Sequence, residues 1–145
     1  MVSTSTITVT SSNEVPELIN ITDKIKKNVQ ESGIKNGLIV VFSQHTTAAV
    51  LLQENEAGIH KDLKEFLESI SSRKKDYHHS VAPDHLVDQM PNGHSHLWHF
   101  LVGGSSQSIP IVNGELLLGQ YQSLFLVELD HARTRNVVVQ IIGEF

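Results

Sequence analysis

The sequence contains no cysteine, which excludes disulfide bonds, thiolate metal sites, iron–sulfur clusters and a cysteine nucleophile. It also lacks an apolar run of about eighteen residues, the minimum for a membrane-spanning helix. The N-terminal segment MVSTSTITVT has neither the basic nor the apolar region of a secretory signal. Together these absences predict a cytoplasmic protein that does not enter a membrane.

Positive charge is scarce as well. The chain has 11 Lys and Arg against 16 Asp and Glu, a formal net charge of −5, whereas proteins held to nucleic acid by charge carry a basic face. Nucleic acid is therefore not an expected partner. The 145 residues are 39% hydrophobic, which is enough to bury a core, and they show neither a linker nor an internal repeat. We expect one folded domain over residues 1–145.

Histidine, in contrast, is abundant. The chain has nine, and most of them fall in one short stretch: His78, His79, His85, His94, His96 and His99. This stretch overlaps residues 71–94, a segment rich in charge, Pro, Asp and Gly that has no helical or strand periodicity. It predicts a long loop that is more mobile than the core, and loops of this length are usually functional or mobile.

Apolar periodicity outlines the rest of the fold. Helical spacing is present at residues 22–33, 59–70 and 95–102. Seven stretches are typical of strands: residues 3–10, 15–21, 37–42, 48–53, 108–112, 121–129 and 136–142. The helices do not alternate regularly with the strands. The order predicts an α+β fold, a mostly antiparallel, seven-stranded β-sandwich with two or three inserted helices.

Three local features add detail to this outline. Thr22 is expected to cap the first helix and Gly33 to end it. The pair Asn113-Gly114 predicts a type I′ turn. The strand at 48–53 is expected to pair with the buried strand at 37–42, which precedes it.

Polar residues follow these two strands. His45 comes directly after the first, where strand ends commonly present site residues; the alternative is a turn histidine held by neighbouring backbone. Glu54 and Glu56 follow the second strand. Their carboxylates can ligate a cation, act as a base or favour the N-terminus of the coming helix through its dipole. For Glu56 the helix dipole is the preferred interpretation, and for Glu54 the alternatives stay open.

The pattern His94-x-His96-x-x-His99 can place two imidazoles on one face of a strand or a helix. Imidazole binds Zn²⁺ and similar ions well. Without cysteine, any metal site must be built from histidine, carboxylate and water, which is typical of an open catalytic site. The alternative is a polar loop whose histidines are solvated.

Two further features favour an anion. Gly103-Gly104-Ser105-Ser106 offers amides and hydroxyls on a flexible backbone, and Arg133 and Arg135 open the last strand with guanidiniums suited to phosphate. The alternatives are an ordinary glycine–serine loop and charges flanking a hairpin turn. Taken together with the histidines and carboxylates, these groups predict a site for a phosphorylated small molecule.

Residues 106–124 resemble the signature of the YjbQ-like family, the so-called secondary thiamine-phosphate synthase family. Ser106, the spaced aliphatic residues, Gly114, Gly119 and Gln122 fall at the intervals of that signature. The sequence departs from it at Gln120 and Tyr121, where the family has Thr-Trp. Tyrosine keeps an aromatic face but changes the size and the hydrogen-bonding end of the side chain.

Five separated blocks extend the resemblance over nearly the whole chain: residues 44–49, Glu54-Asn55 with Asp62, Tyr77-x-His79, residues 92–97, and Glu128 to Arg135 with Gly143-Glu144. The resemblance implies a seven-stranded α+β domain that forms homotrimers about a threefold axis, with its pocket near a subunit boundary. It also implies a secondary ability to join hydroxymethylpyrimidine pyrophosphate to thiazole phosphate, giving thiamine phosphate and pyrophosphate. The main substrate can be another compound.

Two hypotheses about function follow. In the first, the protein is an enzyme acting on a phosphorylated small molecule. Its catalytic residues are His45, Glu54, Asp62, His96, Gln122 and Glu128. Its phosphate-binding residues are Ser105, Ser106, Arg133 and Arg135. A divalent metal, Zn²⁺ or Mg²⁺, is held by His45, His79 and His96, which converge in one pocket. In the second hypothesis, a non-catalytic trimer uses the same groups to bind a metal or a phosphorylated ligand.

Assembly is predicted from the last two strands. Residues 124–127 and 137–142 are apolar on both faces, whereas a half-exposed antiparallel sheet alternates. One face of these strands must meet the core and the other a helix or another subunit. Because few helices are predicted, we favour subunit contact, which usually closes into a cyclic assembly. The alternative is a monomer whose helices cover both faces.

Overall fold

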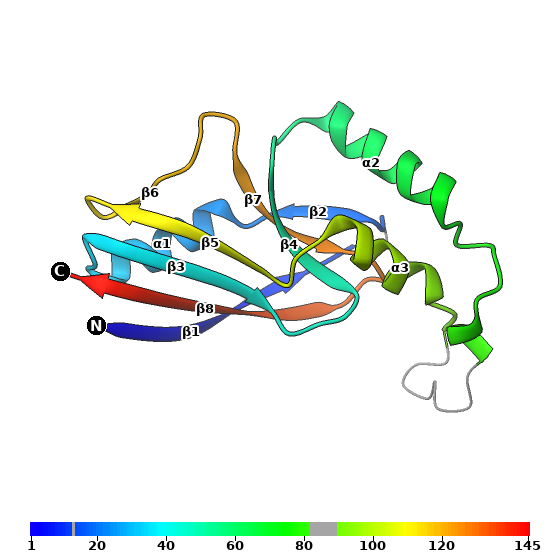
Figure 1. The fold of residues 1–145 in the computed structure, drawn as a ribbon, viewed down its shortest axis with the longest axis horizontal. Helices are drawn as coiled ribbons and strands as arrows, with labels where there is room; N and C mark the ends of the chain where they lie inside the picture. The colour runs from blue at the N-terminus through cyan, green and yellow to red at the C-terminus, as the bar shows by residue number, and fades with distance from the viewer. Residues whose placement is uncertain (13, 82–89) are drawn as a thin grey trace.

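The computed structural model describes residues 1–12, 14–81 and 90–145 and consists of two antiparallel sheets with helices around them (Figure 1). The larger sheet has the order β1-β8-β3-β5-β6 and the smaller one the order β2-β7-β4. The strands are β1 (Val2–Thr10), β2 (Glu17–Asn20), β3 (Asn36–Ser43), β4 (Ala48–Gln53), β5 (Ser106–Val112), β6 (Glu115–Leu116), β7 (Ser123–Glu128) and β8 (Thr134–Glu144). The helices are α1 (Thr22–Ser32), α2 (Ala57–Ile70), α3 (Gly93–Val102) and the 3₁₀ turn η1 (His78–Val81).

The expected mixture of antiparallel strands and helices is confirmed, with eight strands in the described ranges in place of the seven predicted. The additional strand, β6, exists because the chain reverses at Asn113 and Gly114, whose φ angles are 53° and 82°. Positive φ at both central residues is the type I′ turn that the sequence predicts. The turn pairs Val112 with Glu115 at the edge of the larger sheet.

The expected pairing of β3 with β4 is wrong. β3 lies between β5 and β8, while β4 pairs with β7 in the other sheet. The reason is the turn after β3: the Ser43 hydroxyl donates to the Ala48 carbonyl at 2.8 Å, and across this turn the chain passes from one sheet to the other. Strands that are adjacent in sequence are therefore not partners here.

The start of α1 also differs from the expectation. The helix begins at Thr22, but Ile21 occupies the cap position and no side chain caps it. The Thr22 hydroxyl instead donates to Asn20 Oδ1 at 2.6 Å and accepts the backbone N–H of Leu124 at 2.9 Å. It thus joins the helix to β7. The predicted end of the helix is confirmed, because Gly33 adopts a left-handed conformation with φ 72°.

The core has two clusters, and β7 contributes to both. Leu124 and Leu126 belong to the cluster that includes residues of both sheets and of α1, whereas Phe125 and Val127 pack in a second cluster with Leu67 of α2 and Trp98 of α3. All four β7 residues are fully buried. The expectation that one face of residues 124–127 meets another subunit is therefore wrong, since the chain's own helices cover it.

Helix α2 is held near its C-terminal end. Leu67 is its one buried residue, and the indole N–H of the buried Trp98 donates to the carbonyls of Leu67 and Ser71 at 3.0 and 2.9 Å. In Figure 1, α2 and α3 lie at one end of the sheets, and both chain termini lie at the other. No helix in the described ranges is long and apolar enough to cross a membrane.

Part of the expected 71–94 loop lies outside the described residues, namely residues 82–89, which include His85. The described part contains η1 and is tied back by Tyr77, whose hydroxyl donates to the Ser72 carbonyl at 2.6 Å. Helix α3 begins at Gly93, two residues before the predicted start. The mobility of the loop stays a prediction.

Candidate functional site

A buried ion pair forms the base of the site. Glu128 is the last residue of β7 and Arg135 the second residue of β8, and their exposed fractions are 0% and 4%. Arg135 donates from Nε to Glu128 Oε1 at 2.8 Å and from Nη2 to Oε2 at 2.6 Å. Such a bidentate pair fixes both side chains in one geometry.

The pair joins two connections between strands. Glu128 Oε2 also accepts the backbone N–H groups of Leu129 and Asp130 at 3.1 and 3.3 Å, which shapes the β7–β8 connection. On the other side, Arg135 Nη2 donates to Thr47 Oγ1 at 2.8 Å in the β3–β4 connection. Because desolvation offsets much of the attraction in a buried ion pair, its clear contribution is to hold these two connections together.

His45 lies beside this pair in the β3–β4 connection. Its Nε2 is 3.1 Å from the Asn136 carbonyl oxygen, and since a carbonyl only accepts, Nε2 carries the proton. Burial is the main cause that lowers the pKa of His45, and the positive charge of Arg135 lowers it further. A neutral imidazole with its proton on Nε2 presents Nδ1 as a proton acceptor.

Asp130 links the loop between β7 and β8 to the start of α3 by hydrogen bonds. Its Oδ2 accepts from Arg133 Nη2 at 2.8 Å and from Asn92 Nδ2 at 3.2 Å. Asn92 is only 8% exposed, and its Oδ1 has no hydrogen-bond partner among the described residues. Buried acceptors of this kind are nearly always satisfied. The Asn92 oxygen is therefore a position where a donor from water or a ligand fits.

Two of the three predicted metal-binding histidines lie together. The rings of His79 on η1 and His96 on α3 have centroids 4.4 Å apart at an angle of 69°. Two imidazoles at this separation fit the coordination sphere of one ion. Across the described ranges, however, no three His, Asp or Glu side chains are grouped so that they can hold a metal. The described chain thus supplies a pair, not the expected trio with His45.

The other histidines of α3 face different surroundings. His94 is buried against Trp98, with ring centroids 4.8 Å apart, and its pKa is lowered first by burial and then by the charge of Arg73. Burial also lowers the pKa of His99, whose Nε2 is buried with no partner in the described chain. The His94-x-His96-x-x-His99 pattern therefore does not form one metal-binding face.

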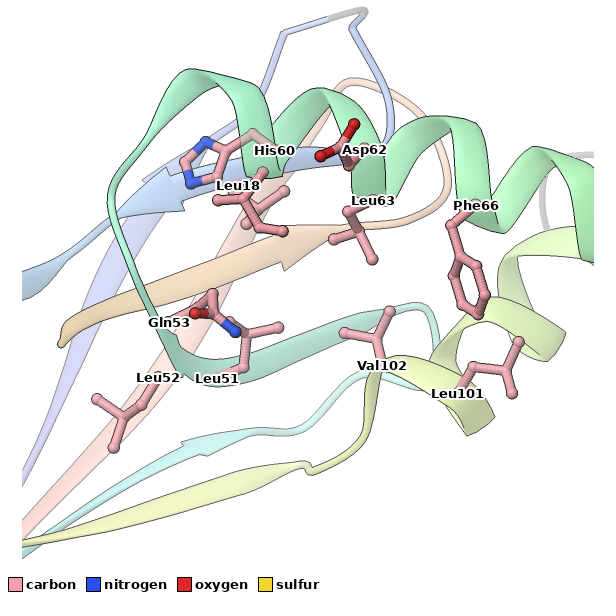
Figure 2. Close-up of a pocket in the computed structure, with 11 residues that line it drawn as sticks. Leu18, Leu51, Leu52, Gln53, His60, Asp62, Leu63, Phe66, Leu101 and Val102 are labelled. Atoms are coloured by element: carbon pink, nitrogen blue, oxygen red, sulfur yellow. The ribbon is translucent and has the colours of Figure 1, made fainter. Parts of the chain in front are cut away.

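Three predicted catalytic residues lie elsewhere. Glu54 directly follows Gln53, the last residue of β4, whereas His45 and Thr47 precede Ala48, the first. The length of the strand, about 17 Å, separates the two ends. Asp62 lines an apolar cavity of about 480 Å³ between α2, β4 and α3 (Figure 2). Gln122 Oε1 accepts the Gly119 N–H at 2.8 Å and so closes the β6–β7 loop.

The two predicted phosphate-binding arginines, and the backbone of Ser105 and Ser106, are engaged within the chain. The guanidinium of Arg135 is held by Glu128 and Thr47, and that of Arg133 by Asp130. The Ser105 carbonyl accepts the Ser43 N–H at 2.7 Å, and Ser106 pairs with Phe42 in the larger sheet. Their binding of phosphate stays a prediction.

Glu56 stabilises the N-terminus of α2, the structural role that the sequence favours. Its carboxylate accepts the backbone N–H groups of Gly58 and Ile59 at 2.6 and 2.8 Å and caps α2. These two hydrogen bonds lower the pKa of Glu56.

Sequence reasoning missed Asn92 and Asp130 as members of the site. A signal for each exists in the sequence: Asn92 precedes Gly93 at the start of a helix, where asparagine is a preferred cap, and Asp130 lies three residues before Arg133. Neither signal distinguishes a site residue from an ordinary cap or loop carboxylate.

Comparison with known proteins covers nearly the whole chain. A family model described as UPF0047 protein YjbQ-like matches residues 5–144. A UPF0047 protein of Methanothermobacter thermautotrophicus is 38% identical over 128 residues, which cover 88% of this chain and 84% of that protein. The UPF0047 protein YugU of Bacillus subtilis is 32% identical over 132 residues, covering 88% of this chain and 90% of that protein.

Solved structures agree with these matches. A hypothetical protein of Aeropyrum pernix superimposes with a TM-score of 0.84 at 33% identity, covering 98% of this chain and 99% of that one. A YbjQ-like protein of unknown function from Sulfolobus solfataricus gives 0.82 at 32% identity, covering 99% of this chain and all of that one. The two sheets and their helices are thus shared with solved relatives.

Proposed function

Since this chain belongs to the UPF0047 YjbQ-like family, we propose that it is an enzyme acting on a phosphorylated, ring-containing small molecule. The observation that carries the proposal is His45, a neutral imidazole whose Nε2–H is bound to the Asn136 carbonyl beside the buried Glu128–Arg135 pair. An acceptor nitrogen fixed in orientation by a rigid support can accept a hydrogen bond from the substrate, and can act as a general base in a main reaction that releases a proton. In the secondary reaction described below the attacking thiazole nitrogen carries no proton, so there His45 orients the substrate.

The surrounding residues divide into support and contact groups. Glu128 and Arg135 are positioning residues, since both are buried and bound to each other. Asn92 Oδ1, which is buried without a hydrogen-bond partner among the described residues, is proposed to accept a donor from the ligand. Arg133, with Ser105 and Ser106, is proposed to meet the phosphate group, and Arg133 must then exchange part of its contact with Asp130 for the ligand.

A divalent ion fits one part of this site. His79 and His96 would supply two of its donors, and imidazole ligands favour Zn²⁺ over Mg²⁺. A bound ion would neutralise phosphate charge and polarise a phosphoryl oxygen.

The reaction that the family resemblance favours is a secondary one. In it, hydroxymethylpyrimidine pyrophosphate and thiazole phosphate combine: a carbon–nitrogen bond forms between the rings, and the carbon–oxygen bond to pyrophosphate breaks. Pyrophosphate leaves with the bonding electron pair. We place this activity in the cytoplasm and in a homotrimer, and the main substrate is a compound of the same chemical class.

The test is incubation of the purified protein with the two thiamine precursors and Mg²⁺ or Zn²⁺, with thiamine phosphate measured by chromatography. His45→Ala and His96→Ala are expected to abolish product. His60→Ala is the matched control, because His60 binds the Glu54 carbonyl near the other end of β4, and it should keep full activity. Absence of product from the wild type, or equal product from all three variants, would contradict the proposed reaction.

The alternative, a non-catalytic trimer that binds a metal or a phosphorylated ligand, is favoured by one observation. Both arginines near the site are already held by carboxylates, Arg133 by Asp130 and Arg135 by Glu128. Calorimetric binding of the same two compounds without turnover would support this alternative, and His45→Ala should then weaken the binding.

A further inference from the structure

Helix α3 and its cap residue carry a row of polar side chains, here called the α3 stripe, which consists of Asn92, His96 and His99. Residues four and seven positions apart lie on one face of a helix. Two of the three have a buried atom without a hydrogen-bond partner in the described chain, Asn92 Oδ1 and His99 Nε2. We propose that the α3 stripe binds the hydroxyl groups of a phosphorylated, sugar-like ring. This inference rests on the proposed function and names the part of the ligand that is not phosphate.

The atom that Asn92 leaves unpartnered is an acceptor. Its other side-chain end lies 3.2 Å from Asp130 Oδ2, and because a carboxylate only accepts, that end is the amide nitrogen. The oxygen is therefore the end that lacks a partner among the described residues. Buried acceptors nearly always receive a hydrogen bond. A ligand that meets this oxygen must supply a donor.

His99 presents an acceptor as well. Its ring donates a hydrogen bond to the Ala48 carbonyl, and since Nε2 has no partner in the described ranges, the donor is Nδ1. Burial is the main cause that lowers the pKa of His99, so the ring is neutral at pH 7. A neutral imidazole carries one proton, and Nε2 therefore offers only a lone pair. This nitrogen too requires a donor.

A serine hydroxyl lies beside the stripe. Ser80 belongs to η1, which is packed on α3: the rings of His79 and His96 are 4.4 Å apart. Close to them, Gly93 touches Tyr77 so tightly that a Cβ on the glycine would collide with the tyrosine. Ser80 Oγ is also buried, and no other group of the described chain bonds to it. Because a hydroxyl both donates and accepts, it is complementary to a hydroxyl group on a ligand.

Both ends of the α3 stripe adjoin the proposed site. Asn92 is bound to Asp130 in the β7–β8 connection. His99 is bound to Ala48, which pairs with Glu128 across the smaller sheet. Figure 1 shows α3 beside β4, the strand that begins at Ala48. The stripe is therefore positioned to contact the same ligand as the residues of the two connections.

The charges favour hydroxyl groups over an ammonium group as donors. A buried cation needs an unpaired carboxylate next to it. The two carboxylates that adjoin the stripe are already engaged, Asp130 by Arg133 and Glu128 by Arg135. Hydroxyl groups are neutral and donate without this requirement.

The spacing of the two acceptors indicates more than one hydroxyl group. Seven residues of α-helix span about 10 Å, so a single hydroxyl cannot bond to both Asn92 and His99. A ring with several hydroxyl groups and a phosphate is the chemistry of a sugar phosphate.

The test compares two probes that share a phosphate group and a five-membered oxygen ring. Methyl ribofuranoside 5-phosphate carries hydroxyl groups on its ring, and tetrahydrofurfuryl phosphate carries none. Calorimetric titration of the wild type should give the riboside an affinity at least tenfold higher, because the other probe leaves buried acceptors unpaired. His99→Phe should reduce this preference to less than threefold. His78→Phe, at an exposed position of η1, is the control and should keep the wild-type ratio.

A ratio of two affinities separates recognition from damage to the fold, since a purely structural change weakens both probes alike. Equal affinities of the wild type for the two probes would overturn this inference and leave the phosphate site of the proposed function standing. Absence of binding by either probe would overturn both. An unchanged ratio in His99→Phe would show that water, not a ligand, satisfies the stripe, which also overturns the inference.

A second measurement does not depend on how His99→Phe folds. In protein labelled with nitrogen-15 in its histidines, the Nε2 resonance of His99 reports whether this nitrogen accepts a hydrogen bond. The resonance should move when the riboside phosphate is added and stay in place with tetrahydrofurfuryl phosphate. A resonance that moves with both probes or with neither contradicts the contact.

Discussion

The guanidinium of Arg135 meets the carboxylate of Glu128 side-on, through Nε at 2.8 Å and Nη2 at 2.6 Å. Glu128 is fully buried, so water does not reach its carboxylate. The same carboxylate accepts the Leu129 and Asp130 amides. One buried charge therefore determines the conformation of the connection that carries Asp130 and Arg133.

Replacing Arg135 with Met should lower the free energy of unfolding by about 3–5 kcal/mol, because it leaves the Glu128 charge buried without a counter-charge. Urea unfolding followed by circular dichroism measures the change. The double variant Glu128→Leu/Arg135→Met is the matched control, and it should recover most of the loss. If Arg135→Met unfolds at nearly the wild-type urea concentration, the pair does not support the site as described.

Acidification should destabilise the fold. Burial is the main cause that lowers the pKa of His45, His94 and His99, so at a pH below their ordinary value of about 6.5 the unfolded chain binds more protons. The free energy of unfolding should then fall as the pH drops below about 6.5 and rise again towards neutral pH. Urea midpoints at pH 7.5 and 5.5 measure this. His94→Gln should show a smaller difference between the two midpoints, and an unchanged difference would contradict the assignment for His94.

Replacing Trp98 with Phe should release α2. The substitution removes the indole donor from the carbonyls of Leu67 and Ser71, at a cost of about 1–3 kcal/mol. Hydrogen exchange should accelerate in α2 much more than in β3 and β8. Ser69→Ala is the control, since it removes an exposed hydrogen bond to Phe66 within the same helix, and it should leave exchange nearly unchanged.

Zinc should bind through the His79–His96 pair. Calorimetric titration of metal-free protein with ZnCl₂ is expected to show one site per chain, which His79→Ala or His96→Ala weakens at least tenfold. His78→Ala changes the histidine next to His79 and should leave the affinity unchanged. Equal Zn²⁺ binding by wild type, His79→Ala and His96→Ala would remove the pair from the proposed site.

Gly37→Ala should destabilise the larger sheet. Gly37 and Gly143 are partners across β3 and β8, and a Cβ on Gly37 would meet the Ile142 carbonyl oxygen and the Gly143 Cα. Since both obstacles are backbone, relief requires a shift of the strands, and we expect a loss of about 2 kcal/mol in the free energy of unfolding. Thr6→Ala, at an exposed position of the same sheet, should change it by less than about 0.5 kcal/mol.

Local patterns in the sequence predict most helices and strands, but not which strands are neighbours. The apolar spacing of Ile59, Leu63 and Phe66 identifies α2, and Asn113-Gly114 identifies the β5–β6 turn. The separation of β3 from β4 depends on the turn closed by Ser43 and Ala48, which has no distinctive composition. Residues 124–127 are apolar on both faces in either case, whether a helix or another subunit covers them, so the sequence pattern cannot decide between the two.

For the candidate site, resemblance to a family identifies His45, Glu128 and Arg135, and the structure shows how they are related. The pairing of Glu128 with Arg135 depends on β7 and β8 belonging to different sheets, which no local pattern reveals. Whether an arginine meets a ligand or an internal carboxylate is a property of the fold. Asn92 and Asp130 lie within two of the blocks that resemble the family, but their place in the site emerges only from their contacts.

The strand order of the larger sheet determines when it can form during synthesis. β8 is the strand that joins β1 to β3, and the Met1 ammonium group donates at 2.7 Å to the carbonyl of Gly143, 142 residues later. At about 5–20 residues per second, β1 leaves the ribosome on the order of ten seconds before its partner does. During that time the nascent β1 is an unpaired strand, and its many serine and threonine side chains keep it hydrated, while the more apolar β3 can already pair with β5.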